Sequence, residues 1–376
     1  MTKLIFCRKC VLPNTRPNLV LDDDGICNAC KTHDVKPNIN WDLRKRAFRE
    51  LIADAKKRSK GYDCLIPVSG GKDSTWQVIV CLEYGLKPLT VTWRPPGRTV
   101  IGQQNLDNLI RLGVDHIDYS FNPRVEAAFM LKAFERYGTP ALPMHMALYN
   151  MPLMLALKFQ IPLVMWGENS ADEYGSSEDC NARGFQLTEE WLAKYGVTHG
   201  TKPDDWIDDQ LTRADLTPYF RPTGNQLNEA GVLGAFLGYY FPWDPQTSLD
   251  AAEKHGFKRR EEGAKTGYWD YADIDDDFIS IHHFLKWYKF GFTRLFDNLS
   301  IEIRNGRLER EEAISIIAAT GDQTPHEDID AFCKFVGIDK KRFFEIVEKF
   351  RNPDIWVQID GKWTIRDFLV ADWQWV

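Results

Sequence analysis

Four cysteines near the amino terminus have the spacing of a metal site. Two residues separate Cys7 from Cys10, and the pair Cys27 and Cys30 repeats that spacing. Two intervening residues let both thiolates of a pair face one ion, and two such pairs supply four tetrahedral ligands. The pattern therefore predicts a structural Zn²⁺ site with no open position for catalysis. A redox pair or an iron–sulfur cluster is the alternative.

A second group of reactive side chains follows the apolar segment 64–68. Its six residues are Ser69, Gly70, Gly71, Lys72, Asp73 and Ser74. Paired glycines between a strand and a helix let backbone N–H groups approach phosphate oxygens, and the helix N-terminus adds a partial positive charge. The hydroxyls can donate hydrogen bonds, Lys72 can neutralise phosphate, and Asp73 can hold Mg²⁺. The pattern predicts a phosphate-binding loop in which Lys72 and Asp73 are exposed.

Acidic and amide side chains follow another apolar segment, 161–166. The loop begins at Gly167 and contains Glu168, Asn169 and Asp172. In parallel sheets, ligands bind beyond the carboxyl ends of the strands. We therefore expect Asp172 to be catalytic and Glu168 and Asn169 to contact substrate. Solvated loop charges without a role are the alternative.

The order of the apolar segments predicts the fold that positions these loops. Strands are expected at 64–68, 88–93, 116–119 and 161–166 and within 232–243. A helix is expected at 42–60, before the first strand, and further helices between the strands at 75–84, 100–112, 123–137 and 144–159. Strand–helix alternation of this kind indicates an α/β fold with right-handed crossovers and a mainly parallel sheet.

The remaining segments suggest three parts. Residues 1–40 are a cysteine module, residues 41–265 are the α/β domain with a polar insertion that contains short helices at 176–230, and residues 266–376 are a mostly helical C-terminal domain. The helices expected in this last part are 277–290, 293–304, 310–320, 325–336 and 340–350. Asp360 and Gly361 indicate a hairpin between segments 355–359 and 363–365.

Composition limits the classes of function. The chain has 376 residues, 44% of them hydrophobic, and a formal net charge of −7. A chain with this negative net charge has no overall positive potential that would attract long nucleic acid, so no nucleic-acid partner is expected. The most apolar stretch, 141–159, contains polar residues and two prolines and predicts a buried helix, not membrane insertion. Eight cysteines without a secretory signal favour a cytoplasmic location.

The loop at 69–74 resembles that of the PP-loop ATP pyrophosphatases. It reads S-G-G-K-D-S. It is not a Walker loop, because Ile66 stands where that motif has its first glycine and Asp73 follows the lysine. The resemblance implies that these residues bind ATP, with Thr92 and Trp93 near the adenine and Gly167 also in contact. Packing within the sheet is the alternative for Trp93.

Further segments resemble the N-acetyl sugar amidotransferase family of bacterial surface-polysaccharide and O-antigen synthesis. They are C-R-K-C-V-L-P-N-T-R-P with G-I-C-N-A-C, W-G-E-N-S-A-D-E-Y-G, K-T-G-Y-W-D-Y and H-H-F-L-K-W-Y-K-F-G-F-T-R. The resemblance spans about residues 7–350. It implies that ATP adenylylates the amide oxygen of an N-acetyl sugar, which is expected to be nucleotide-linked, and that ammonia displaces AMP to give an acetamidino group.

The implied reaction suggests roles for several side chains. Lys72 and Mg²⁺ on Asp73 would stabilise the charge that builds on pyrophosphate. A uronic acid or nucleotide diphosphate is anionic, so Lys265, Lys286, Lys289 and Arg294 are candidate anchors, with surface charge as the alternative. For His145, His282 and His283, structural or surface roles are expected.

A partner must supply the ammonia. The chain has no cysteine in a G-x-C-x-G elbow, and residue 2 is threonine, so no glutaminase activity is expected. The resemblance implies a separate glutamine amidotransferase subunit with ammonia channelled between the two proteins.

Two alternatives remain. A PP-loop tRNA sulfurtransferase would combine the loop with the cysteines and use the basic run at 56–60 to hold RNA. A non-enzymatic zinc-ribbon adaptor would only bind ATP. Retention of tRNA would favour the first, and nucleotide binding without pyrophosphate release would favour the second.

Overall fold

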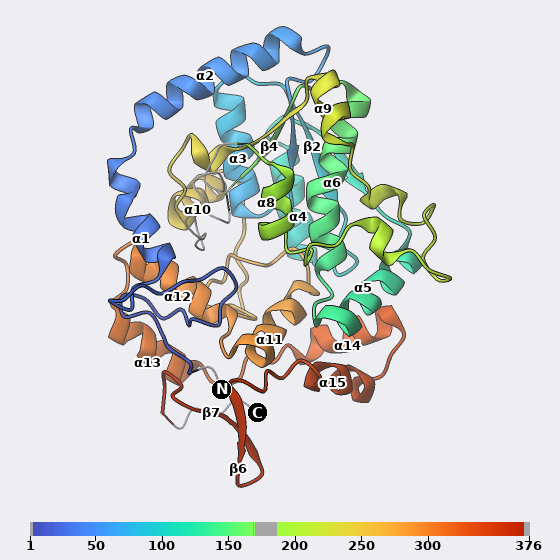
Figure 1. Ribbon diagram of the computed structural model, residues 1–376. Helices are drawn as coiled ribbons and strands as arrows, with labels where there is room; N and C mark the ends of the chain where they lie inside the picture. The colour runs from blue at the N-terminus through green and yellow to red at the C-terminus, as the bar shows by residue number, and fades with distance from the viewer. Residues whose placement is uncertain (1–2, 168, 170–185, 372–376) are drawn as a thin grey trace.

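A five-stranded parallel sheet forms the centre of the protein, as the alternating pattern predicted. The computed structural model describes residues 3–167, 169 and 186–371 (Figure 1). The strand order is β3-β2-β1-β4-β5. The strands are β1 (Cys64–Pro67), β2 (Pro88–Trp93), β3 (Asp115–Tyr119), β4 (Leu163–Trp166) and β5 (Leu233–Phe236). Because the order reverses direction at β1, the carboxyl ends of β1 and β4 flank the point where ligands bind in such sheets.

Helices cover both faces of this sheet. Leu65 of β1 belongs to one core, and its neighbours Cys64 and Ile66 belong to the other, because successive strand residues point to opposite faces. On the Leu65 side lie α5 (Pro123–Tyr137), α6 (Leu142–Phe159), α8 (Glu189–Tyr195) and α9 (Gly224–Ala230). On the other side lie α2 (Trp41–Arg58), α3 (Lys72–Glu83), α4 (Val100–Ile110) and α10 (Pro245–Glu253).

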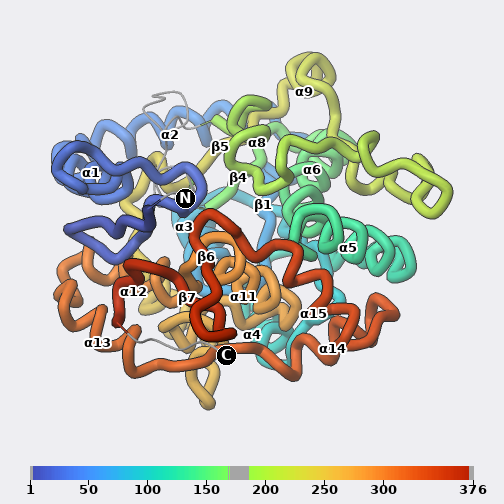
Figure 2. The backbone as a smooth tube through the Cα atoms, turned by 60° about the horizontal axis from the view of Figure 1, so that its bottom comes forward, coloured from blue at the N-terminus to red at the C-terminus, as the bar shows by residue number. Residues whose placement is uncertain are grey.

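The C-terminal region is mostly helical and lies below the sheet in the view of Figure 1. Its helices are α11 (Ile279–Phe290), α12 (Arg294–Arg304), α13 (Arg310–Thr320), α14 (His326–Val336) and α15 (Lys340–Glu348). The expected hairpin is present as β6 (Trp356–Ile359) and β7 (Lys362–Ile365), paired antiparallel. Figure 2 brings this region forward and shows the hairpin in front of α11.

The cysteine module packs on the C-terminal region. Its four cysteines share a core with Phe292 and Phe296 and with residues of α13. Arg310 of α13 donates hydrogen bonds to the carbonyls of Cys7 (3.3 Å) and Cys10 (3.1 Å). The first and last parts of the chain therefore bury apolar surface together, although almost the whole sequence separates them.

Two helices had not been expected. One is α1 (Asn28–Val35), whose N-cap is Cys27, and the other is α10. The described residues also form four short 3₁₀ helices, Lys36–Asn38, Pro203–Trp206, Thr217–Tyr219 and Leu237–Tyr239. Within the part of the chain that is described, no helix combines the length and apolar composition needed to cross a membrane.

Candidate active site

One cavity of about 750 Å³ lies at the carboxyl ends of the strands. Four strands contribute to it, because Val68, Thr92, Gly167 and Phe236 follow or end β1, β2, β4 and β5. The opposite wall is formed by residues 269–294 of the C-terminal region. The cavity is therefore closed only when the sheet and the C-terminal region pack together.

The phosphate-binding loop forms one side of the cavity. Gly70 has a φ of +88°, and a Cβ placed there would lie 2.6 Å from the backbone nitrogen of Leu106. Ser69 Oγ accepts a hydrogen bond from the N–H of Gly71 (3.2 Å), and Ser74 Oγ donates to the carbonyl of Gly71 (3.0 Å). Because α3 begins directly after Gly71, the free N–H groups of its first turn lie beside this loop.

Lys72 is buried, so the prediction that it is exposed was wrong. Only 4% of the surface of Lys72 is exposed. The ammonium lies 2.5 Å from Asp73 Oδ2, and the rings of Trp243 and Tyr271 lie 5.7 and 5.6 Å from it. Trp243 also donates to Asp73 Oδ1 (2.9 Å). The two aromatic rings come from distant parts of the chain and cover a side chain that the local sequence places at the surface.

The end of β2 contributes one polar side chain to the sheet and one ring to the cavity. Thr92 donates its hydroxyl to the carbonyl of Val68 (2.6 Å). Trp93 lines the cavity and donates its indole N–H to Glu126 Oε1 (2.8 Å). Burial raises the pKa of Glu126 to about 7, although the Trp93 hydrogen bond acts in the opposite direction. The orientation of the Trp93 ring is therefore fixed by a buried acid.

The acidic loop after β4 is described only in part. Gly167 lines the cavity. Asn169 is buried and accepts a hydrogen bond from the Trp191 indole (3.0 Å). Glu168 and Asp172 lie outside the described residues.

Positively charged side chains gather on the wall opposite the sheet. Arg16 of the cysteine module (2.9 Å) and Lys286 (2.8 Å) bind the buried carboxylate of Asp297, and Arg294 lies 4.0 Å from it. Burial alone would raise the pKa of Asp297, but these cations hold it far below its usual range. Arg294 also binds Asp273 (2.9 Å). All three cations line the cavity, so an anionic group of a ligand would meet them there.

The other two predicted lysine anchors differ in position. Lys289 lines the cavity and donates to the carbonyl of Tyr137 (2.9 Å). Burial, and next the charge of Lys286, lower its pKa to about 8. Lys265 is not among the lining residues. Its ammonium binds Asp277 (2.6 Å) and Asp328 (2.5 Å) and so connects the chain before α11 to α14.

Two further acids line the cavity, the half-buried Asp275 and the buried Asp276. Burial raises the pKa of Asp275 to about 6 and that of Asp276 to about 8. Near neutral pH the negative charge of Asp276 is therefore reduced, so this carboxyl compensates the cations of the same wall only in part.

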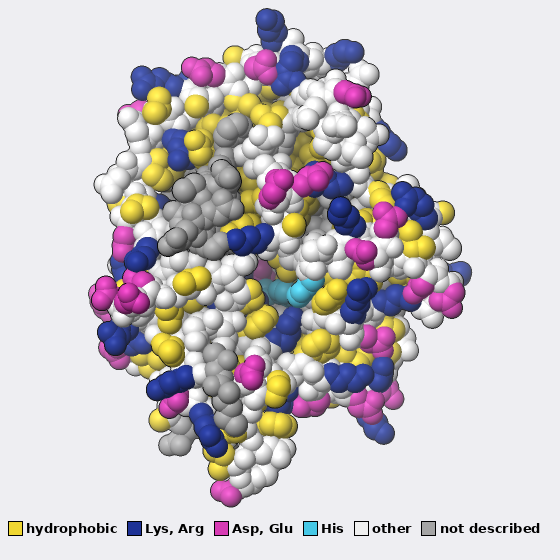
Figure 3. Space-filling view, in the orientation of Figure 1, with side chains coloured by type: hydrophobic (Ala, Val, Ile, Leu, Met, Phe, Trp, Pro, Cys, Tyr) yellow, Lys and Arg dark blue, Asp and Glu magenta, His cyan; other side chains and the backbone are white. Residues whose placement is uncertain are grey.

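Sequence reasoning missed several lining residues. Four of the eight histidines line the cavity, namely His145, His199, His282 and His283, and Arg16 joins them from the cysteine module. Figure 3 shows histidine side chains near the middle of a hollowed face. A signal was present, because His282, Lys286 and Lys289 recur at the spacing of one helix face. Nothing in the sequence connected that face to His145 or Arg16.

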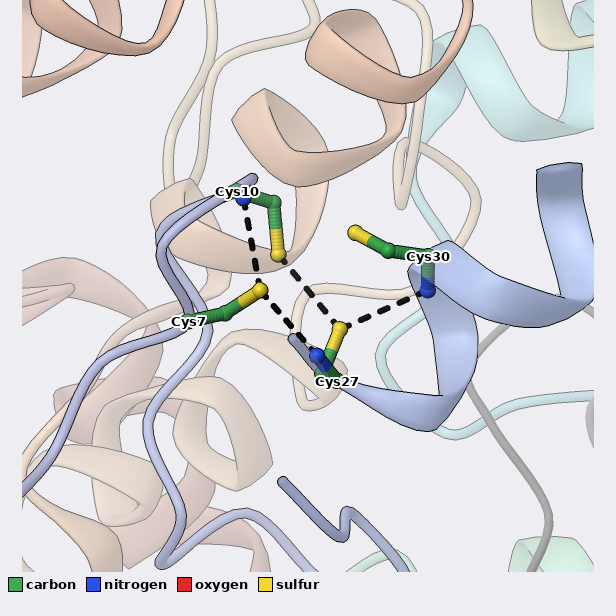
Figure 4. A group of neighbouring side chains, drawn as sticks. All are labelled: Cys7, Cys10, Cys27 and Cys30. Carbon is green, nitrogen blue, oxygen red and sulfur yellow. Dashed lines mark hydrogen bonds between the residues drawn. The ribbon is translucent and has the colours of Figure 1, made fainter. Parts of the chain in front are cut away.

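The four cysteines form a compact group, and none of them is a lining residue of the cavity. All four are buried, and their sulfur atoms lie within 4.8 Å of one another (Figure 4). Backbone N–H groups of Cys10 (3.5 Å) and Cys27 (3.2 Å) donate to Cys7 Sγ. A tetrahedral ion with Zn–S bonds of about 2.3 Å places its sulfurs about 3.8 Å apart, and the Cys10 and Cys27 sulfurs are 3.7 Å apart. The residues therefore fit one ion.

A comparison with protein-family models gave a match in the C-terminal region. Residues 253–369 match the family of the LPS biosynthesis protein WbpG-like, C-terminal domain. This match confirms the resemblance to proteins of bacterial surface-polysaccharide synthesis. A comparison with curated proteins gave no match.

Two solved structures are similar at low identity. An NMN synthetase from Francisella tularensis has 13% identity and a TM-score of 0.26, covering 51% of this chain and 93% of that one. The U34-tRNA thiolase NcsA from Methanococcus maripaludis with its [4Fe-4S] cluster has 11% identity and a TM-score of 0.35, covering 90% of each chain.

Proposed function

We propose that this chain, whose residues 253–369 match a WbpG-like C-terminal domain, is an ATP-dependent amidotransferase of surface-polysaccharide synthesis. Its substrate would be a nucleotide-linked N-acetyl sugar, and its product the corresponding acetamidino sugar. The observation that carries the proposal is a single cavity that has the phosphate-binding loop on one side and a cationic wall on the other. Such a cavity is suited to bring a nucleoside triphosphate and a second, anionic substrate together.

The first step would take place at the loop. The amide oxygen of the sugar attacks the α-phosphorus of ATP, and the bond to pyrophosphate breaks. An amide is a poor electrophile because of its resonance, and adenylylation gives its carbon a good leaving group. Lys72, held in place by Asp73 and Trp243, would stabilise the charge that develops on pyrophosphate.

Asp73 is suited to hold Mg²⁺. Both of its oxygens already accept hydrogen bonds, but a carboxylate offers about four lone-pair positions. Mg²⁺, when bound, would neutralise phosphate charge. Asp172 remains a candidate second acidic residue.

The second substrate would be held by the cationic wall. Lys286, Lys289 and Arg294 line the cavity together with Arg16, so a uronate or diphosphate would replace part of the contact that these cations make with Asp297 and Asp273. Lys265 is less suited to this role, because two carboxylates already bind its ammonium.

Ammonia would come from a partner glutaminase. The lining residues of the described chain include no cysteine that could attack glutamine. Cys64, Cys81 and Cys333 are buried elsewhere. The four amino-terminal cysteines would bind structural Zn²⁺.

The test is a reconstitution with defined components. The purified chain is incubated with ATP, Mg²⁺, ammonium and a panel of nucleotide-linked N-acetyl sugars, and the products are analysed by mass spectrometry. We expect AMP, pyrophosphate and a sugar in which NH has replaced O. Formation of ADP and orthophosphate, or a requirement for tRNA, would contradict the proposal. Omission of the sugar is the control for uncoupled hydrolysis.

A further inference from the structure

The proposed reaction releases a proton from nitrogen. The amide and ammonia together carry one more N–H bond than the amidinium product. This balance holds whether the proton leaves when the amide oxygen is adenylylated or after ammonia has added. We therefore expect a group in the cavity to accept a proton, and that group must be unprotonated before it does so.

His145 of α6 has the required form of the ring. Its Nδ1 lies 2.7 Å from the carbonyl oxygen of Ala141. A carbonyl oxygen only accepts hydrogen bonds, so Nδ1 carries the ring proton and the lone pair of the neutral ring is on Nε2. The side chain is half-buried and lines the same cavity as the phosphate-binding loop.

The contacts of two neighbouring histidines do not fix the position of the ring proton in this way. Nδ1 of His282 lies 2.8 Å from the hydroxyl of Thr139, which also accepts a hydrogen bond from the N–H of Ala141 (3.3 Å). A hydroxyl has one donor hydrogen and two acceptor lone pairs, so this contact is compatible with either tautomer of His282. His283 is only 4% exposed and bonds to Thr266 (3.1 Å). Of these three rings, His145 is the one whose contact with a carbonyl oxygen leaves the lone pair on Nε2.

The surroundings of His145 keep it neutral. Burial, and next the charges of Lys286 on α11 and of His199, lower its pKa to about 4, whereas the bond to Ala141 acts in the opposite direction. The His282 ring, with its centroid 5.8 Å away, faces it from α11. An anionic substrate that binds Lys286 would offset part of this positive potential, and proton uptake would then become easier.

We propose that Nε2 of His145 accepts the proton that nitrogen loses when the acetamido group becomes an acetamidino group. This inference depends on the proposed function. In the second step the C–N bond forms as ammonia attacks the adenylylated carbon, the proton passes from nitrogen to Nε2, and the C–O bond breaks with its electron pair leaving on AMP. If adenylylation itself releases the proton, Nε2 accepts it from the amide nitrogen at that stage.

The experiment compares two variants with the wild type and a control. In His145→Asn the side-chain amide can still donate to the Ala141 carbonyl, but the basic Nε2 is lost. His145→Ala opens space for added imidazoles. The matched control is His255→Asn, because His255 is exposed and does not line the cavity. Rates of AMP and amidino-sugar formation are measured with ammonium as nucleophile, together with sugar binding by calorimetry and thermal unfolding.

The wild type is measured first. If it forms no AMP with any N-acetyl sugar, the proposed function itself fails. If it is active, we expect His145→Asn to bind sugar normally and to lose about 10²- to 10⁴-fold in kcat. Added imidazoles should restore the rate of amidino-sugar formation by His145→Ala, and the restored rate should increase with the basicity of the imidazole. A kcat of His145→Asn within threefold of the wild type, or restoration that does not depend on basicity, would overturn the assignment.

Discussion

Lys72, to which we assign a catalytic charge, is positioned by more than its own loop. The ammonium is enclosed by Asp73, Trp243 and Tyr271, so its position is restricted before any phosphate arrives. Preorganised charges of this kind act without reorganisation during the reaction. An alanine at this position would also leave a cavity, because the residue is buried.

We predict that Lys72→Met lowers the rate of pyrophosphate release by at least about 10²-fold. Methionine retains most of the side-chain volume, so the thermal unfolding temperature should change little. A fixed-time pyrophosphate assay measures the first quantity and calorimetry the second. Lys87→Met, a change of a lysine outside the cavity lining, is the control. Normal turnover by Lys72→Met would remove the role assigned to this charge.

Asp297 holds the cationic wall together. Its carboxylate has no exposed side-chain surface and neutralises part of the charge of Arg16, Lys286 and Arg294. Removal of one partner from a buried ion pair costs about 3–5 kcal/mol, because the remaining charges stay buried without compensation. We therefore predict that Asp297→Asn lowers the free energy of unfolding by about that amount near pH 7.

The same carboxylate gives a pH dependence. The pKa of Asp297 is lower in the folded than in the unfolded chain, so its stabilising contribution is present above the unfolded value of about 4 and is lost as the pH falls. Urea unfolding at a series of pH values should show a steeper loss below about pH 4–5 for the wild type than for Asp297→Asn. Equal slopes for the two proteins would contradict this assignment.

At the scale of elements, the turn from β1 to α3 depends on Gly70. Its positive φ costs an L-residue about 1–2 kcal/mol, and a Cβ would lie 2.6 Å from the backbone of α4 at Leu106. A backbone atom inside a helix has little freedom to move away. The loop therefore needs a glycine at this position for steric reasons, independent of any contact with phosphate.

We predict that Gly70→Ala lowers the unfolding temperature by several degrees and weakens ATP binding by at least tenfold, because the loop must shift. Gly61→Ala is the matched control, since nothing lies within 4 Å of a Cβ there and its φ is not positive. Thermal unfolding and nucleotide titration measure the two effects. An unchanged affinity for ATP in Gly70→Ala would show that the loop conformation does not matter for binding.

Helix α1 shows how an element can depend on a metal-binding pattern. Its N-cap is Cys27, whose sulfur accepts a hydrogen bond from the N–H of Cys30. Sequence periodicity gave no reason to expect this helix. By contrast, α10 begins with Asp244 as N-cap and Pro245 in its first turn, which is an ordinary start signal that could have been recognised.

At the scale of the whole molecule, the cysteine module is a wall of the cavity as well as a separate motif. It shares a core with α12 and α13, and its Arg16 reaches the carboxylate of Asp297. Loss of the proposed Zn²⁺ should therefore affect parts of the molecule that are distant in sequence.

We predict that Cys7→Ser, or treatment with a strong chelator, releases metal and increases hydrogen exchange in α12 and α13 as well as in residues 1–40. The reason is that these helices lose the apolar surface against which they pack. Mass spectrometry of peptides measures the extent of hydrogen exchange in each segment, and the peptides of α2–α4 serve as an internal control. Exchange that increases only within residues 1–40 would mean that the module is energetically independent.

The sequence by itself determined the features that depend on local order. The spacing of four cysteines predicts a metal site at Cys7, Cys10, Cys27 and Cys30. The residues from Ser69 to Ser74 predict a phosphate-binding turn between a strand and a helix. The parallel sheet also followed from the alternation of apolar segments, because periodicity and turn chemistry are properties of neighbouring residues. Within the described chain, these elements are present near the expected boundaries.

Only the tertiary structure decided which charged side chains share a cavity. Lys265 and Lys286 look equivalent in the sequence, yet the first is bound between Asp277 and Asp328, whereas the second lines the cavity. Likewise Arg16, His145 and His282 are brought together from three separate segments. The physical reason is that burial and charge pairing depend on contacts between segments far apart in the chain, about which local patterns carry no information.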